Sequence, residues 1–299
     1  MGGTFYEENS RSLRSADRGY TTKSASEIFA SKLHESLNPM NLRFRESRDS
    51  EAHPNSLPVI IGLDVTGSMG KIPHNLIQTG LPTMMTTLIK AGLNDAAVCF
   101  VAIGDHKSDK APIQIAQFES GDLELDTHLE NTWLEGNGGG NNGESYFLAW
   151  YFAARKTQTD AWEKRKVKGF LFTIGDEHCH AEIEANSPSA RNNLTSIFGD
   201  GSEGTVKAID LLKEAQQKYH VFHLNLATDE NIQNTWRSIL GENNIKVSDY
   251  TEIPKIIAAK ILEFSDPSSK DRNPNNEPGQ TVDDEDFETE DKTKTKITL

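Results

Sequence analysis

The stretch VIIGLDVTGSMG, residues 59–70, joins an apolar run to an acidic residue and two hydroxyl residues. The run LPVIIGLD (57–64) predicts a strand that is buried on both faces, because it is nearly continuously apolar. Asp64, Thr66 and Ser68 follow one another at every second position. Ligands of α/β proteins bind beyond the carboxyl ends of parallel strands, so we expect these three side chains to face one crevice.

Apolar runs and amphipathic segments alternate from residue 57 to about 265, which predicts a mostly parallel sheet covered on both faces. The expected strands are 57–64, 96–104, 112–118, 167–176 and 219–226. The expected helices are 71–91, 145–157, 181–198, 204–218, 229–240 and 252–264. The short polar turn DHKSDKA between the second and third strands predicts an antiparallel pair. The fold class is therefore predicted to be a three-layer α/β/α sandwich with one antiparallel edge strand.

The two ends of the chain differ from this middle region. Residues 1–56 are predicted to form an arm with one helix at SASEIFASKLHESL (24–37), which begins with a capping box of Ser24 and Glu27. Its apolar residues recur every four positions, so we expect the helix to pack on the main domain, 57–265. The acidic tail, 266–299, has almost nothing apolar and is predicted to be disordered.

The charge and the cysteine content of the chain limit which kinds of partner and which cellular compartment are expected. The chain has 31 basic and 45 acidic residues, a net charge of −14, which argues against nucleic acid as the main partner. Only two cysteines are present, too few for a secreted disulfide framework. No apolar stretch approaches the ~20 residues of a membrane span, and the first residues lack the apolar core of a signal peptide. We therefore expect a cytoplasmic protein that binds neither membranes nor nucleic acid.

The segment around Asp64 resembles the D-x-S/T-x-S signature of the metal-ion-dependent adhesion site (MIDAS) of von Willebrand factor A (vWA) domains. The resemblance implies a vWA fold over 57–265 and a further site residue, Asp176, at the end of the strand in GFLFTIGDE. In the family a second loop supplies a ligand, usually Thr, but GNGGGNNGE (136–144) contains none. This loop is similar to the GGGD-x-x-E loop of bacterial and kinase-associated members, which implies that Asn141 or Glu144 takes the ligand position.

One carboxylate with neutral hydroxyls suits a hard cation such as Mg²⁺ or Mn²⁺, with oxygens at roughly 2.0–2.2 Å. The resemblance implies that this ion leaves one coordination position for an Asp or Glu of a partner protein. Intracellular bacterial and phage members of the family often belong with AAA+ ATPases or with stress and conflict systems. The implied function is that of a binding adaptor or scaffold, and not an enzyme.

Other interpretations of the same residues stay open. D-V-T-G-S is also similar to the D-K-T-G-T motif of phosphorylating ATPases and related phosphatases, which would make Asp64 a nucleophile in phosphoryl transfer. A third alternative is a structural protein with a vestigial metal site. The spacing of the glycines fits neither a phosphate-binding loop nor a dinucleotide fingerprint.

His178, Cys179 and His180 stand in direct succession, a poor spacing for a tetrahedral metal site. We interpret them as a surface loop beside Asp176. Asp105 ends the strand 96–104 and either reaches the crevice or caps the turn after that strand.

Overall fold

The computed structural model describes residues 4–40, 42–136, 143–200 and 203–265. Its main sheet has six strands in the order β10-β9-β6-β2-β3-β4, and all neighbours are parallel except β3 and β4. The strands are β2 (Leu57–Asp64), β3 (Ala96–Ile103), β4 (Ile113–Ile115), β6 (Gly169–Gly175), β9 (Tyr219–Asn225) and β10 (Asn244–Lys246). The predicted α/β class, with its antiparallel edge strand, is confirmed.

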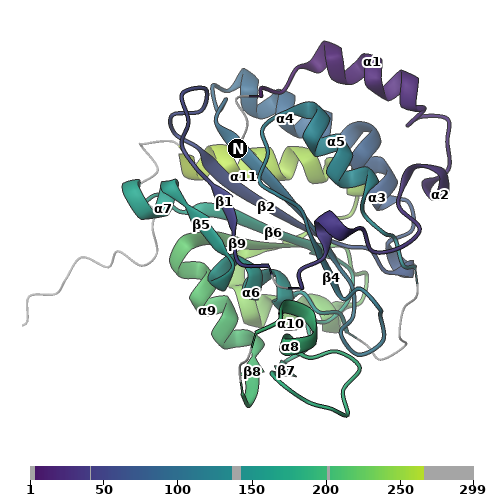
Figure 1. Ribbon diagram of the computed structural model, residues 1–299, viewed down its shortest axis with the longest axis vertical. Helices are drawn as coiled ribbons and strands as arrows, with labels where there is room; N and C mark the ends of the chain where they lie inside the picture. The colour runs from purple at the N-terminus through teal and green to yellow at the C-terminus, as the bar shows by residue number, and fades with distance from the viewer. Residues whose placement is uncertain (1–3, 41, 137–142, 201–202, 266–299) are drawn as a thin grey trace, which may run out of the picture. The chain divides into compact units, whose positions relative to one another are not determined.

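Helices cover both faces of this sheet (Figure 1), and each face has its own apolar core. One core takes Ile60 of β2 and packs against α6, α8, α9 and α10; the other takes Val59, Ile61 and Leu63 and packs against α4, α5 and α11. Alternate residues of a strand point to opposite faces, which is why a continuously apolar strand serves both cores. The helices are α4 (Leu81–Lys90), α5 (Asp122–Glu130), α6 (Phe147–Arg155), α8 (Leu194–Phe198), α9 (Ala208–Lys218), α10 (Glu230–Leu240) and α11 (Ile253–Ser265).

The helix predicted for 71–91 contains a π-helical turn. It is made of α3 (Ile72–Asn75), the π-helical segment η3 (Leu76–Gly80) and α4. The guanidinium of Arg11 donates hydrogen bonds to the carbonyls of Ile77 and Gln78 within this segment. A π-turn changes the pairing of helical carbonyls, and the arm supplies a donor where that change occurs.

The N-terminal arm differs from the prediction. The expected helix at 24–37 is wrong: α2 covers only Ala25–Ile28, Phe29 is extended, and a short 3-10 helix lies at Glu35–Leu37. At the start of α2, the Glu27 carboxylate accepts a hydrogen bond from the Ser24 N–H at 2.9 Å, as a capping box requires. A helix that was not predicted, α1 (Glu8–Arg18), docks through Arg11 and Arg14, which bind Asp126 of α5.

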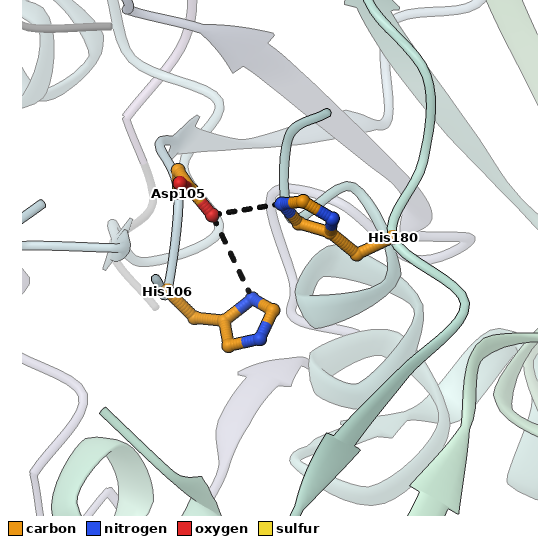
Figure 2. Close-up of side chains that lie close together, drawn as sticks. All are labelled: Asp105, His106 and His180. Carbon is orange, nitrogen blue, oxygen red and sulfur yellow. Dashed lines mark hydrogen bonds and ion pairs between the residues drawn. The ribbon is translucent and has the colours of Figure 1, made fainter. Parts of the chain in front are cut away.

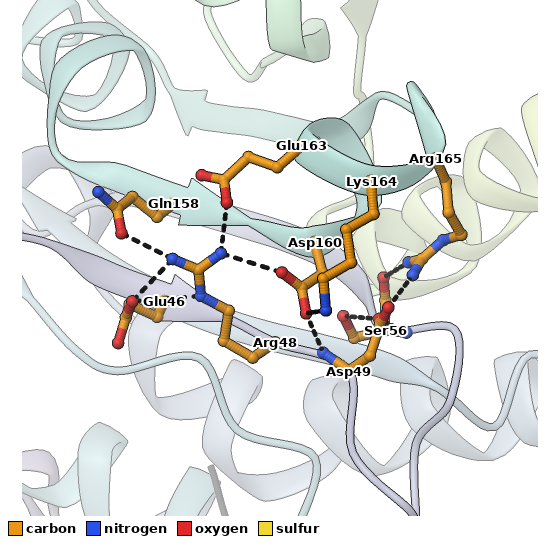
Figure 3. Close-up of polar contacts among 9 residues, drawn as sticks. All are labelled: Glu46, Arg48, Asp49, Ser56, Gln158, Asp160, Glu163, Lys164 and Arg165. Atoms are coloured by element: carbon orange, nitrogen blue, oxygen red, sulfur yellow. Dashed lines mark hydrogen bonds and ion pairs between the residues drawn. The ribbon is translucent and has the colours of Figure 1, made fainter.

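A second polar contact holds the later part of the arm (Figure 3). Strand β1 (Arg45–Ser47) pairs in parallel with β5 (Thr157–Thr159), which leads into α7 (Asp160–Arg165). Arg48 donates to Asp160 at 2.9 Å, to Gln158 at 2.6 Å and to Glu46 at 2.9 Å. The arm is thus joined to the main domain by hydrogen bonds and ion pairs as well as by apolar contacts.

A small two-stranded sheet lies outside the main one. Helix 181–198 was wrongly predicted, because residues 182–184 form β7 (Glu182–Glu184), which pairs with β8 (Thr205–Lys207), and only α8 is helical. Short 3-10 helices lie at Gly67–Met69, Gly241–Asn243 and Tyr250–Glu252. Residues 1–262 form one unit, and of the second unit, 263–299, only 263–265 are described. None of the helices in the described ranges is long and apolar enough to cross a bilayer.

Candidate metal site

Asp64 lies at the carboxyl end of β2, in the middle of the sheet, and is fully buried. Its Oδ1 accepts hydrogen bonds from the Thr66 N–H at 2.8 Å and from the Thr66 hydroxyl at 2.6 Å. The Thr66 hydroxyl lies 3.4 Å from the Ser68 hydroxyl, which is exposed. The spacing of every second residue therefore does bring the three side chains together.

Asp176 comes to the same place from the neighbouring strand β6, because the carboxyl ends of parallel strands meet at one edge of the sheet. The Ser68 hydroxyl donates to Asp176 Oδ1 at 2.9 Å. An unbroken set of short oxygen–oxygen contacts thus runs from Asp64, through Thr66 and Ser68, to Asp176.

The second loop is described only in part. Asn141 lies outside the described residues, whereas Glu144 is buried, with 4% of its surface exposed. Within the described part of the chain its Oε2 has no hydrogen-bond partner. Burial, followed by the charges of Asp64 and Asp105, raises the pKa of Glu144 to about 9. A cation bound beside this buried carboxyl group would stabilise its ionised form.

Tyr146 is a residue of the site that sequence reasoning missed. Its hydroxyl donates to the second oxygen of Asp64, Oδ2, at 2.8 Å. Tyr146 starts an apolar helix and was predicted only as part of that helix. The hydroxyl has room because residue 175 is glycine: a Cβ there would lie 1.9 Å from it. A tyrosine within an apolar run therefore indicates a polar partner inside the protein, because a buried hydroxyl needs one.

Burial raises the pKa of Asp64 to about 6, although the hydrogen bonds from Thr66 and Tyr146 act in the opposite direction. Neighbouring oxygens in an octahedral Mg²⁺ shell lie about 3.0 Å apart, because each is about 2.1 Å from the ion. The contacts of 2.6, 3.4 and 2.9 Å along this set bracket that spacing. The charges that act most strongly on Glu144 are all carboxylates. The donors and the electrostatics therefore both fit a hard divalent cation.

Figure 2 shows a second polar cluster, from the segments that follow β3 and β6, the two strands next to β2. His180 Nε2 is 2.9 Å from Asp105 Oδ1, and all of Asp105, His106 and His180 are buried. The interpretation of His180 as part of a surface loop was wrong, because that ring is 8% exposed and bound to Asp105. Asp105 also accepts from the Lys107 N–H and the Ser108 hydroxyl, as a turn cap does. Burial, with the neighbouring His180, lowers the pKa of His106 to about 4.

Comparison with models of known protein families and with curated proteins gives no match. Solved structures do match. The pilus adhesin SpaC from Lactobacillus rhamnosus GG, in its open conformation, has a TM-score of 0.48 and 16% identity over 70% of this chain and 30% of the adhesin. The vWF domain of the type V pili tip protein Mfa5 from Porphyromonas gingivalis has a TM-score of 0.46 and 14% identity over 69% of this chain and 95% of the domain. An aerotolerance-related membrane protein from Bacteroides fragilis has a TM-score of 0.40 and 15% identity over 70% of this chain and 100% of the solved chain.

This chain thus matches less than a third of the length of the SpaC adhesin. Similarity at this level concerns the arrangement of helices and strands. What the protein does has to be argued from its own residues.

Proposed function

We propose that the protein is a vWA-type binding module that holds Mg²⁺ or Mn²⁺ at Asp64, Thr66 and Ser68, assisted by Asp176 and Glu144, and binds an acidic side chain of a protein partner. The observation that carries this proposal is the set of oxygens from Asp64 to Asp176, spaced as neighbouring ligands of a hard cation are. Oε2 of the buried Glu144 adds an oxygen that has no hydrogen-bond partner in the described residues, and a bound cation would favour the ionised form of this carboxyl group.

Each residue has a distinct role in this proposal. Thr66 and Ser68 offer hydroxyl oxygens, and Asp64 and Asp176 hold those hydroxyls by hydrogen bonds. Ser68 is exposed and so marks the side from which a partner approaches. A bound divalent cation would supply positive charge to an external carboxylate at this opening. The net charge of −14 does not prevent that contact, because fields between exposed charges are screened over about 8 Å at physiological salt.

Phosphoryl transfer from Asp64 is less well supported. A nucleophilic carboxylate needs an oxygen that can approach a phosphorus atom. Asp64 is fully buried, and both of its oxygens accept hydrogen bonds, Oδ1 from Thr66 and Oδ2 from Tyr146. We therefore favour binding without catalysis. By family resemblance we also propose a cytoplasmic adaptor role, with AAA+ ATPases among the first partners to test.

Calorimetric titration of Mg²⁺ and Mn²⁺ into the metal-stripped full chain tests the proposal. We expect saturable binding by the wild type and at least about tenfold weaker binding by Ser68→Ala, because removing one ligand oxygen lowers the affinity for the ion. The matched control is Ser26→Ala, which removes an exposed hydroxyl in α2 of the arm. Its affinity should equal that of the wild type.

The second arm of the experiment is a binding assay with free glutamate-rich peptide in Mg²⁺ and in EDTA. Retention only in Mg²⁺, lost in Ser68→Ala, supports the grip on an acidic group. Wild-type protein that takes up no metal at millimolar concentration would contradict the proposal and favour a vestigial site. Turnover of a phosphatase substrate that stops in Asp64→Asn would favour the enzymatic alternative.

A further inference from the structure

The cluster of Asp105, His106 and His180 has a composition different from that of the Asp64 crevice. It offers two imidazole nitrogens and one carboxylate, and one potential ligand atom of each residue lies within 4.8 Å of the other two. All three side chains are buried. Buried imidazoles that converge on one carboxylate are the donor set of sites for transition metals, and Mg²⁺ prefers oxygens.

We propose that Asp105, His106 and His180 bind a divalent transition-metal ion of the Zn²⁺ class. The spacing supports this assignment. Two ligands of a tetrahedral Zn²⁺ lie about 3.3 Å apart when each is about 2.0 Å from the ion. Asp105 Oδ1 lies 2.9 Å from His180 Nε2 and 3.8 Å from His106 Nδ1, which brackets that value. Each of these two distances is within about half an ångström of that value.

The ligands are held in place by the backbone around them. The Lys107 N–H and the Ser108 hydroxyl bind the Asp105 carboxylate at 3.0 and 2.9 Å and fix its plane. The backbone N–H of His106 donates to the Ser145 hydroxyl at 2.8 Å, and the backbone N–H of His180 donates to the Glu144 carbonyl at 3.1 Å. These bonds fix the Asp105 carboxylate and the backbone from which the two imidazole rings extend.

Gly143 leaves room for the His180 ring. A Cβ at this position would lie 2.8 Å from His180 Cε1 and 2.9 Å from Nδ1. The absence of a side chain at residue 143 thus allows the ring to turn its Nε2 toward Asp105. Gly143 belongs to the Gly-rich segment 136–144, which is predicted from the sequence to contribute to the Asp64 site. Gly143 itself also makes room for a residue of the Asp105 cluster.

One residue of the cluster, His106, borders a cavity. His106 lines a cavity of about 360 Å³, together with Lys107, Glu182, Glu184, Arg191 and Asn192. The cavity offers space for an ion and for water on the His106 side of the cluster. The Ser145 hydroxyl lies 2.7 Å from His106 Nδ1, and a metal bound to that nitrogen would replace this hydrogen bond.

Occupancy of this site would connect two loops across the sheet. Asp105 and His106 come after β3, whereas His180 comes after β6, and β2 with Asp64 lies between these strands. The ion would therefore fix the loops on either side of the Asp64 crevice. The two sites have no ligand in common, so each can be tested in the absence of the other.

The test is competition of Zn²⁺ between the metal-stripped full chain and a chromophoric chelator, with the visible absorption of the Co²⁺ form as a second readout. We expect one Zn²⁺ per chain, a tetrahedral Co²⁺ spectrum, and at least about 100-fold weaker binding by His106→Gln and by His180→Gln. The matched control His178→Gln removes a half-buried histidine two residues from His180 and should bind as the wild type does. Ser68→Ala should also keep its Zn²⁺ affinity.

Circular dichroism of each variant shows whether it is folded, and the Co²⁺ spectrum of the wild type decides the matter if a variant is not. A wild type that shows no tetrahedral Co²⁺ spectrum, or Zn²⁺ affinity that is the same in His180→Gln, overturns the proposal. Either result would mean that the Asp105–His180 hydrogen bond holds the loops without an ion. Loss of Zn²⁺ binding in His178→Gln would also overturn it, because the ligands would then lie elsewhere.

Discussion

Replacing Glu144 by glutamine is expected to stabilise the metal-free protein while weakening its binding of Mg²⁺. Burial and neighbouring carboxylates raise the pKa of Glu144 from its ordinary 4.5 to about 9. Near neutral pH the folded protein therefore either holds a proton there or bears a buried charge, and both are unfavourable relative to the unfolded chain. Glutamine keeps the shape and removes the charge.

The magnitude comes from the linkage between proton binding and folding. The folded state keeps its proton above pH 4.5, where the unfolded chain loses it, so the free energy of unfolding falls as pH rises from about 4.5 to about 9. Each pKa unit corresponds to about 1.4 kcal/mol, which gives at most about 3.5 kcal/mol at pH 7. Because relaxation and water reduce such energies, we expect Glu144→Gln to gain about 1–3 kcal/mol there.

Urea unfolding in EDTA at about pH 5, 7 and 8.5 measures both the gain and its slope. Wild-type stability should fall over this range, and the fall should be smaller in Glu144→Gln. Asp64, whose pKa is also raised, to about 6, contributes to the fall that remains below about pH 6. Glu182→Gln, which removes an exposed acid in β7, is the control and should change neither quantity.

The reasoning would be refuted by a Glu144→Gln variant that is less stable than the wild type at about pH 7 and keeps the full slope. That result would mean that Glu144 is stabilised by a donor within the fold. Calorimetry on the same variant gives the other half of the prediction, because a neutral amide should lower the affinity for Mg²⁺ by roughly tenfold.

Two further substitutions test how the site and the arm are supported. Gly175→Ala places a Cβ 1.9 Å from the Tyr146 hydroxyl and should lower the free energy of unfolding, measured in urea, by about 1–3 kcal/mol. Combination with Tyr146→Phe should restore part of this loss. Full stability of the single variant would contradict the close approach. Arg11→Ala leaves the fully buried Asp126 with one arginine fewer and should lower the free energy of unfolding by about 3–5 kcal/mol. The control Arg237→Ala removes an exposed arginine and should change nothing. A loss below about 1 kcal/mol in Arg11→Ala would mean that this ion pair does not hold α1.

The sheet was predictable because its strands carry a strong local signal. Strands β2, β3, β6 and β9 are buried on both faces, so they appear in the sequence as apolar runs. The arm was not predictable in the same way. Helix α1 presents Arg11 and Ser15 to the protein, and its one leucine, Leu13, is 75% exposed. A helix that docks through charge has no apolar stripe to detect.

The wrong helix at 24–37 has a different cause. Phe29 and Leu37 are both buried, so the residues were rightly expected to be covered. Phe29 reaches the core from an extended segment, in which the next residue, Ala30, pairs with Trp133, and Leu37 reaches it from a short 3-10 helix. Apolar residues four positions apart fit a helix, but a folded-back loop with two anchors produces the same spacing.

The candidate site was predicted where its residues lie within one motif and missed where they come from several. Asp64, Thr66 and Ser68 belong to one loop, and Asp176 was found through a family pattern. Tyr146 and His180 reach their carboxylate partners across 82 and 75 residues of sequence. Contacts over such separations depend on the register of the strands, which local patterns do not specify.

The π-turn at Leu76–Gly80 amounts to one residue inserted into an α-helix. Removal of a single residue there would restore regular i→i+4 pairing and rotate α3 by about 100° relative to α4. The carbonyls of Ile77 and Gln78 would then be committed to the helix, and Arg11 would lose two acceptors. In a related chain that lacks the extra residue, an arginine at this place would therefore keep its ion pair with Asp126 but lose its two acceptors in the helix.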